Sequence, residues 1–91
     1  MSSIVVEFFG IARQRALVPF AEIPVDGPVT IADVLRRLAD QIPSLVPDCI
    51  ADGQLSECCA VNVNGDRFVT DVSISLRSSD RLLILSADAG G

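Results

Sequence analysis

The most informative stretch of the chain is RLLILSADAGG, at residues 81–91. Its first part, residues 81–85, is an almost continuous apolar run, which is typical of a buried central strand. Its second part, residues 86–91, contains only small or short side chains. Six extended residues span about 20 Å, and glycine lets the backbone enter a slot too narrow for other residues. The stretch therefore predicts a central strand that is followed by a flexible tail, although small-residue chain ends are also often merely frayed.

The segments at the start of the chain predict two further strands of a single domain, residues 1–91. Residues 4–9 are β-branched and aromatic, as is typical of a strand. Residues 17–25 contain Pro19 and Pro24, and their alternate positions could face a core through Leu17, Ala21, Ile23 and Val25. Because proline has no amide donor, we expect this second strand at an edge of the sheet.

One segment has the signals of an amphipathic helix. Thr30 can cap its first turn, and Asp33 completes an acidic variant of the capping box. Pro43 ends it, because the residue before proline resists the helical conformation. For residues 43–57 we expect a long connection with one short helical turn around residues 46–51. The apolar stripe of the helix comprises Ile31, Val34, Leu35, Leu38 and Ile42.

The second half of the chain predicts three strands. Residues 58–63 alternate, which places Cys59, Val61 and Val63 on one face. Asn64-Gly65 favours a two-residue hairpin, and residues 67–69 would form its short return strand. With the run at residues 81–85, the order of elements favours one sheet with one helix packed across it, an α+β fold.

Composition excludes several classes of function. The chain has 7 basic and 12 acidic side chains, a net charge of -5, and no His. Nucleic-acid binding needs a positive footprint, and histidine is the commonest general base and a common metal ligand. Cys49, Cys58 and Cys59 have no C-x-x-C spacing, so we expect no metal site and no disulfide framework. Without a signal segment or an apolar run of membrane length, we expect a cytoplasmic protein that contacts neither membrane nor nucleic acid.

Taken together, the segments resemble the MoaD/ThiS sulfur-carrier family, small ubiquitin-like β-grasp proteins that end in Gly-Gly. The resemblance covers nearly the whole chain and implies one mixed sheet of four to five strands packed on one main helix. Its motifs are FFGIAR at residues 8–13, VTIADVL at residues 29–35, VNVNG at residues 61–65, and the last strand and tail at residues 80–91.

This resemblance implies a carrier that is not itself a catalyst. In such families an adenylating, ubiquitin-activating-like partner uses ATP to activate the terminal glycine carboxylate, and a sulfur donor then leaves a thiocarboxylate. Carried onto this chain, Gly91 holds the reactive carboxylate and Gly90 threads the partner's channel, with Asp88 and Ala89 entering the partner before them. The chain has no G-x-x-x-x-G-K-[ST] loop for ATP phosphates, so we expect it to bind no cofactor of its own.

Two features of the sequence bear on which molecule accepts the sulfur. The Phe-Phe opening and the Ala-Arg element lean toward the small subunit of molybdopterin synthase, whose large subunit would take the sulfur. Carriers for thiamine thiazole, cysteine or another sulfur metabolite remain alternatives. So do a ubiquitin-like protein modifier and a stand-alone β-grasp interaction module.

Three aromatic residues are candidates for partner binding. If Ile4 and its alternate neighbours face the helix, Phe9 and Phe20 lie on the opposite face of the sheet, where Phe68 can join them. Such an apolar patch often marks a docking surface. The alternative is that the long connection at residues 43–57 covers it. For Cys58 and Cys59 we expect one core thiol, one exposed thiol and no redox role.

Overall fold

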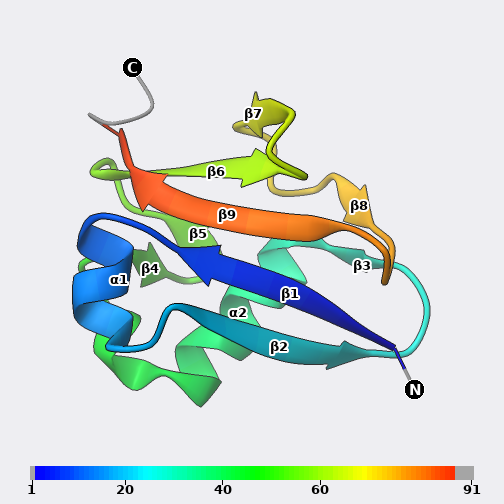
Figure 1. Ribbon diagram of the computed structural model, residues 1–91, viewed down its shortest axis with the longest axis horizontal. Coiled ribbons are helices and arrows are strands. Elements are labelled where there is room, and N and C mark those ends of the chain that lie inside the picture. Colours follow the sequence, from blue (N-terminus) through cyan, green and yellow to red (C-terminus); the bar gives the residue numbers. More distant parts are fainter. Residues whose placement is uncertain (1, 88–91) are drawn as a thin grey trace.

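The computed structural model describes residues 2–87 and contains one mixed five-stranded sheet (Figure 1). The strand order is β2-β1-β9-β6-β7. Strands β1 and β9 are parallel, and the other neighbouring pairs are antiparallel. The α+β fold with one mixed sheet is therefore confirmed. The bounds are β1 (Ser2–Phe8), β2 (Phe20–Val25), β6 (Cys59–Val63), β7 (Arg67–Val69) and β9 (Arg81–Ser86).

One main helix, α2 (Ile31–Gln41), covers one face of this sheet. The Asp33 amide donates to Thr30 Oγ1 at 3.1 Å, and the Thr30 amide donates to Asp33 Oδ2 at 3.4 Å. The predicted capping box is thus present. The apolar stripe is buried against the sheet as expected, through Ile31, Val34, Leu35 and Leu38.

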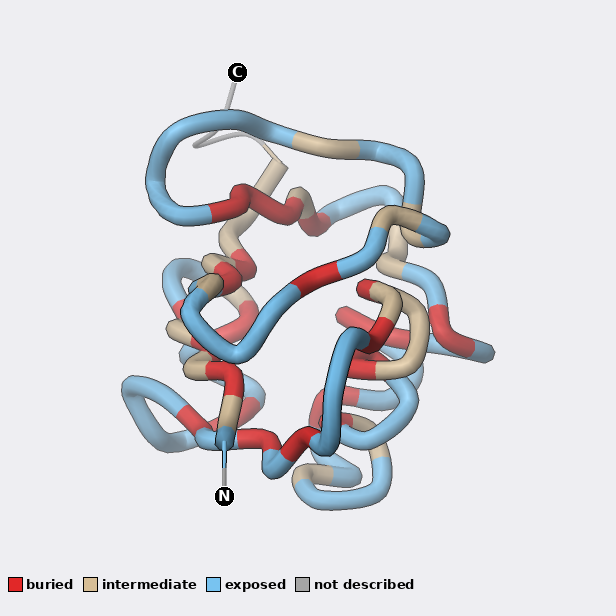
Figure 2. The backbone as a smooth tube through the Cα atoms, turned by 90° about the vertical axis from the view of Figure 1, so that its right-hand side faces the viewer, coloured by how far each residue is buried: buried red, intermediate tan, exposed pale blue. Residues whose placement is uncertain are grey.

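The register confirms where the strands were expected to lie. Strand β9 pairs with β1 on one side and with β6 on the other, so the apolar run at the end of the chain is central. Strand β2, which contains Pro24, lies at an edge. In Figure 2 the buried residues lie along the more central stretches of the backbone, and the surrounding loops are mostly exposed. Strand β9 includes Ser86, one residue more than the apolar run predicts.

No helix was predicted between Gly10 and the strand expected from Leu17, and this was wrong. Residues Ile11–Ala16 form a short helix, α1. Ala12 and Ala16, one helical turn apart, are its buried residues, and small side chains at that spacing let the helix pack closely. Leu17 ends the helix in the left-handed conformation, with φ 65°, and is 83% exposed. It therefore does not face the core, and the strand begins at Phe20.

The connection after α2 also differs from the expectation. A 3-10 turn, η1 (Pro43–Leu45), comes first, and β4 (Ile50–Ala51) then pairs with β5 (Gln54–Leu55). The one short helical turn expected in this connection is thus present, but it lies at residues 43–45 and not around residues 46–51. Asp52 and Gly53 have φ of 53° and 73°, which suits a tight hairpin between two short strands.

Two smaller features complete the fold. Strand β3 (Val29–Thr30) pairs with β8 (Ser75–Leu76) beside the start of α2. The hairpin between β6 and β7 has three loop residues, 64–66, between paired Val63 and Arg67, where two were expected. Within residues 2–87, no helix has the length and apolar composition needed to cross a membrane.

Candidate functional site

The face of the sheet opposite α2, here called the open face, is crossed by one continuous row of side chains. Strand pairing aligns one residue from each of the five strands, and we call this set the outer row. In order from β2 to β7 it consists of Phe20, Glu7, Leu83, Asn62 and Phe68. Within residues 2–87, no helix or strand forms a second layer over this face (Figure 1).

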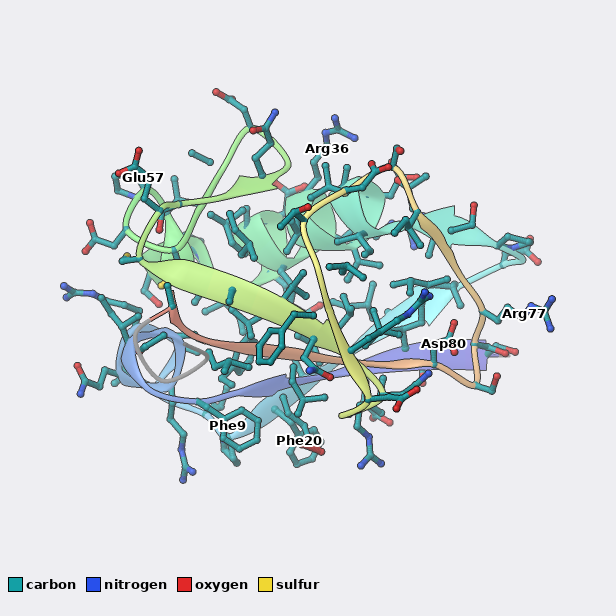
Figure 3. The ribbon with its side chains drawn as sticks, turned by 90° about the horizontal axis from the view of Figure 1, so that it is seen from above. Phe9, Phe20, Arg36, Glu57, Arg77 and Asp80 are labelled. Atoms are coloured by element: carbon teal, nitrogen blue, oxygen red, sulfur yellow. The ribbon has the colours of Figure 1, made fainter. Side chains whose placement is uncertain are left out.

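The three aromatic candidates are all substantially exposed. Phe20 is 53%, Phe68 is 52% and Phe9 is 42% exposed. Figure 3 shows Phe9 and Phe20 on the side of the sheet away from Arg36, which is on α2. The connection at residues 43–57 packs against α2 and does not cover them. Their exposure is confirmed, but Phe68 does not join the other two in one patch, because β7 and β2 are the opposite edges of the sheet. Contact of these residues with a partner stays a prediction.

Between these aromatic ends the outer row holds one apolar residue, Leu83, with a polar residue on either side of it. Glu7 Oε1 lies 3.2 Å from Arg81 Nη1, an ion pair open enough to water to contribute about 1 kcal/mol at most. Asn62 is only 7% exposed, and its Oδ1 is buried with no hydrogen-bond partner. A buried acceptor left unpaired costs about 1–3 kcal/mol of folding free energy. One polar group of this face therefore lacks a partner within the described structure.

The root of the tail, Ser86 and Ala87, is held by two hydrogen bonds. The Ile11 amide donates to Ser86 Oγ at 2.9 Å, and the Ala87 amide donates to the Cys58 carbonyl at 2.8 Å. Gly10 has φ 58°, and a Cβ there would overlap the Ser86 side chain. The chain therefore leaves the domain next to the turn that follows β1. The tail candidates Asp88, Ala89, Gly90 and Gly91 lie outside the described residues.

The cysteines separate into two buried thiols and one exposed thiol, as expected for Cys58 and Cys59. Burial raises the pKa of Cys59 to about 12 and also raises the pKa of Cys49. Thiolates are the nucleophilic form, so these two side chains are inert at neutral pH. Cys58 donates to the Asp48 carbonyl at 3.2 Å and remains accessible.

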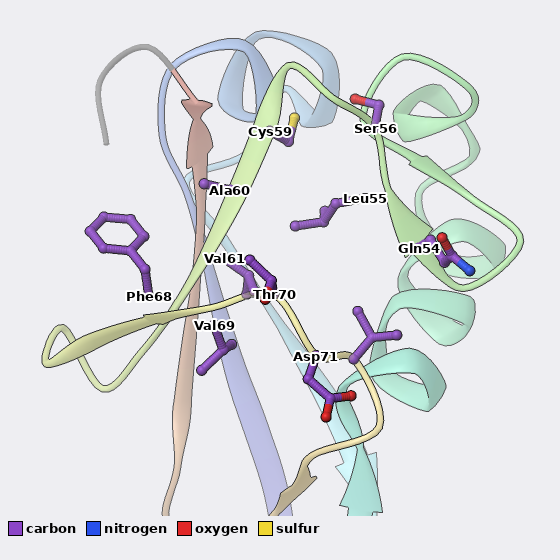
Figure 4. A pocket seen from close by; sticks show the side chains of 11 residues that line it. Gln54, Leu55, Ser56, Cys59, Ala60, Val61, Phe68, Val69, Thr70 and Asp71 are labelled. Carbon is purple, nitrogen blue, oxygen red and sulfur yellow. The ribbon is translucent and has the colours of Figure 1, made fainter. Parts of the chain in front are cut away.

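One groove of about 460 Å³ lies between β5, β6, β7 and the segment that follows β7 (Figure 4). Leu55, Val61 and Val69 contribute apolar surface to it, and the ring of Phe68 points away from Leu55 toward the other side of the sheet. Asp71 is its one ionisable carboxylate, and hydrogen bonds from Ser73 lower the pKa of that carboxyl. The other ionisable side chain that lines the groove is Cys59, whose pKa burial raises to about 12.

No metal centre can be assembled from the described residues. Residues 2–87 contain no group of three or more His, Cys, Asp or Glu side chains placed to hold an ion. The candidate site therefore consists of the exposed aromatic residues of the open face and the root of the tail at Ser86 and Ala87. The aromatic residues were predicted from the sequence, whereas Asn62 and Ser86 were not singled out, because the burial of Asn62 and the hydrogen bond to Ser86 depend on residues far away in the sequence.

The comparisons with known proteins agree with this arrangement. Residues 6–91 match the model of the ThiS family. Among curated proteins, none matches the chain closely enough to count as a relative.

Solved structures with the same fold include the small archaeal modifier protein SAMP1 from Haloferax volcanii. It is 24% identical with a TM-score of 0.79, over 98% of this chain and 99% of that one. A Pyrococcus furiosus protein assigned as molybdopterin converting factor subunit 1 is 19% identical with a TM-score of 0.75, over 94% and 98%. A chain of the Amycolatopsis orientalis BexX/CysO complex is 21% identical with a TM-score of 0.70, over 97% and 99%.

These neighbours establish the β-grasp fold, and the family match extends over nearly the whole sequence. On that basis, this chain belongs to the ThiS family.

Proposed function

We propose that this chain is a sulfur carrier whose Gly91 carboxylate is adenylated by a partner enzyme and converted to a thiocarboxylate. The observation that carries the proposal is the geometry at the end of β9. The strand delivers Ala87, held by Cys58, to a point beside the open face, four residues before Gly91. Four extended residues reach about 13 Å, enough to enter the active site of an enzyme docked on that face.

The chemistry explains why a carrier needs such partners. A carboxylate is a poor electrophile, so its oxygen first attacks the α-phosphorus of ATP and pyrophosphate leaves. A persulfide sulfur then displaces AMP from the acyl carbon. Reduction of the resulting S–S bond by a second thiol leaves the thiocarboxylate on Gly91. The chain acts as a substrate in each step, and ATP binds to the adenylating enzyme.

The open face would be the docking surface for these enzymes. Aromatic residues with large, rigid side chains dominate the energetics of many interfaces. Phe9, Phe20 and Phe68 present three such side chains on one face. In the tail, Asp88 and Ala89 would enter the partner ahead of Gly90, whose missing Cβ lets the backbone pass a narrow channel.

For the acceptor pathway we favour molybdopterin synthesis, with the large subunit of molybdopterin synthase as the sulfur-accepting partner. Support comes from the FFGIAR segment and from a neighbour that is assigned as molybdopterin converting factor subunit 1. The CysO neighbour favours a different sulfur acceptor as the next candidate. The reducing conditions that keep Cys58 free would be met in the cytoplasm.

A protein modifier is the second candidate function, favoured by the neighbours named small archaeal modifier proteins. The first chemical step is the same, because an acyl-adenylate also precedes conjugation to an amine. The two functions diverge afterwards. A carrier ends as a free thiocarboxylate, whereas a modifier ends as an adduct of higher mass.

The first test is ATP–pyrophosphate exchange with the purified adenylating enzyme from the same organism. We expect the full chain to support exchange and a chain lacking Gly91 not to. Equal exchange with both chains, or none with either, would contradict the proposal.

The docking surface is tested in the same assay with a matched pair of variants. Phe20→Ser removes an aromatic side chain from the open face, and we expect it to raise KM about tenfold, equivalent to about 1.4 kcal/mol. Val46→Ser removes a comparably exposed apolar side chain, 43% exposed, from the connection on the helix side. It should leave KM unchanged. Equal effects of the two substitutions would show that the open face is not the docking surface.

A further inference from the structure

Asn62 is the one polar residue of residues 2–87 that is buried. It is also the one residue in that range with a buried side-chain oxygen lacking a hydrogen-bond partner. Native proteins leave few such groups, because the unpaired acceptor has lost its water without gaining a donor. Its presence therefore calls for an explanation.

The position of Asn62 makes the residue more unusual. Val61 and Val63 on either side of it face the core, so Asn62 points to the open face. Strand pairing sets Leu83 on one side of it and Phe68 on the other. Directly opposed residues have Cβ atoms about 5 Å apart, so two apolar side chains flank the amide. An apolar residue of similar size would suit these neighbours better.

Changing the orientation of the amide does not remove the problem. Rotation by half a turn exchanges the oxygen and the nitrogen, and the inner position would then hold an unpaired N–H group. The other polar member of the outer row differs, since Glu7 already has Arg81 as its partner. Asn62 thus carries the acceptor of the open face that is left without a donor.

We propose that Asn62 determines the specificity of the open face, by accepting a hydrogen bond from an N–H or O–H group of the docked adenylating enzyme. The complementary surface on that enzyme is apolar, with one donor opposite Asn62. This inference rests on the docking surface proposed above. It adds the polar contact by which the correct partner is distinguished from any other apolar surface.

The structure also indicates how the donor reaches Asn62. Phe68 lies opposite Asn62 on β7, an edge strand of three residues, and half of its surface is exposed. Its ring can change rotamer at little cost, because no described element packs over it. A shift of Phe68, the neighbour of Asn62 on this edge strand, would give the donor a path to Asn62 Oδ1. A partner without a donor would keep the amide buried and unpaired, and such a penalty is an effective means of discrimination.

The test uses the substitution Asn62→Leu, which removes the unpaired group and keeps a similar volume. We expect two effects of opposite sign. The denaturant midpoint of unfolding should rise, because the desolvation penalty disappears. The Kd for the purified adenylating enzyme, measured by titration calorimetry, should rise about tenfold, because the donor on the enzyme loses its acceptor.

Asn62→Ala provides a second variant that adds no bulk beside Phe68, and it should weaken binding to a similar degree. If wild type and both variants bind with equal Kd, the role of Asn62 is refuted while the carrier proposal stands. If wild type itself neither binds nor is adenylated, both proposals fail together. If the substitutions change self-association in sedimentation but not enzyme binding, the occupant is a second copy and the inference is wrong.

Discussion

Two neighbouring rows of the same sheet lie a single residue apart along each strand, yet they differ in burial and in polarity. The inner row, Ala21, Val6, Leu82 and Val63, is fully apolar and buried against the helix side. The outer row holds two exposed phenylalanines, an ion-paired glutamate and an unpaired asparagine. Because successive side chains of a strand point to opposite faces of the sheet, the same strands supply both rows.

The two rows differ in the free energy that their side chains gain from burial. Each inner-row residue gains free energy from burial, at about 25 cal/mol per Å² of apolar surface. Asn62 gains little from its position, and Phe20 and Phe68 leave half of their surface in water. Burial therefore contributes less to the stability of the outer row than to that of the inner row.

The largest effect that separates the two rows should come from consecutive leucines of β9. Leu82→Ala empties a fully buried inner-row site and should lower the free energy of unfolding by about 3 kcal/mol. Leu83→Ala alters the half-buried outer row and should cost under about 1 kcal/mol. Denaturant unfolding of both variants measures the difference. Equal losses would mean that both faces are packed alike.

Cys58 and Cys59 allow an exposed and a buried position to be compared by the reactivity of their thiols. Cys58 is exposed, whereas burial holds the pKa of Cys59 at about 12. A thiol reagent at pH 8 should modify Cys58 about 100-fold faster than Cys59 or Cys49, because the buried thiols react only after local opening. Peptide mapping against time measures the rates. Rapid modification of Cys59 in the folded protein would contradict its burial.

The helix that covers the inner row depends on its first turn. Thr30→Ala removes the acceptor of the Asp33 amide and should lower the free energy of unfolding by about 1 kcal/mol. Thr70→Ala, at an exposed site without a capping role, is the control and should have almost no effect. Thermal unfolding distinguishes them, and a loss at Thr70 as large as at Thr30 would rule out the cap as the cause.

The smallest effect should be the dependence of stability on acid. Hydrogen bonds lower the pKa of Asp33, Asp71 and Asp80, mainly from the Thr30 amide, the Ser73 side chain and the Arg77 amide respectively. The unfolded chain binds protons more readily than the folded chain. The stability that these carboxylates contribute is therefore complete above their unfolded pKa, near 4, and is lost as the pH falls through the lower folded values.

A pH series of thermal unfolding, with Asp80→Asn as the variant, checks this linkage. The midpoint of wild type should fall as the solution is acidified below about pH 4. The variant should lose less over the same range, because one of the three groups no longer titrates. A midpoint that rises on acidification would reverse the predicted sign.

Local signals made much of the fold predictable. Thr30 with Asp33 located the start of α2, Pro24 indicated an edge strand, and the apolar run of β9 indicated a central one. The parts that were missed lack a periodic pattern. Helix α1 has only two buried alanines, and two-residue strands such as β4 are too short to show alternation.

The candidate site also has one part that the sequence predicts and another that depends on long-range contacts. Alternation along β1 and β6 is enough to place Phe9 and Asn62 on the side of the sheet away from the helix. The burial of Asn62 depends on Leu83 and Phe68 beside it, and the anchoring of Ser86 depends on Ile11, 75 residues away. Long-range pairings of this kind leave no trace in local sequence.

One measurement would decide whether the chain carries sulfur: the intact mass of the protein after incubation with its adenylating enzyme, ATP and a persulfide donor. We expect a species heavier by the difference between one sulfur and one oxygen atom, with the added mass confined to the peptide that ends in Gly91. An unchanged mass, or a covalent adduct with another protein in place of the free thiocarboxylate, would contradict the carrier function.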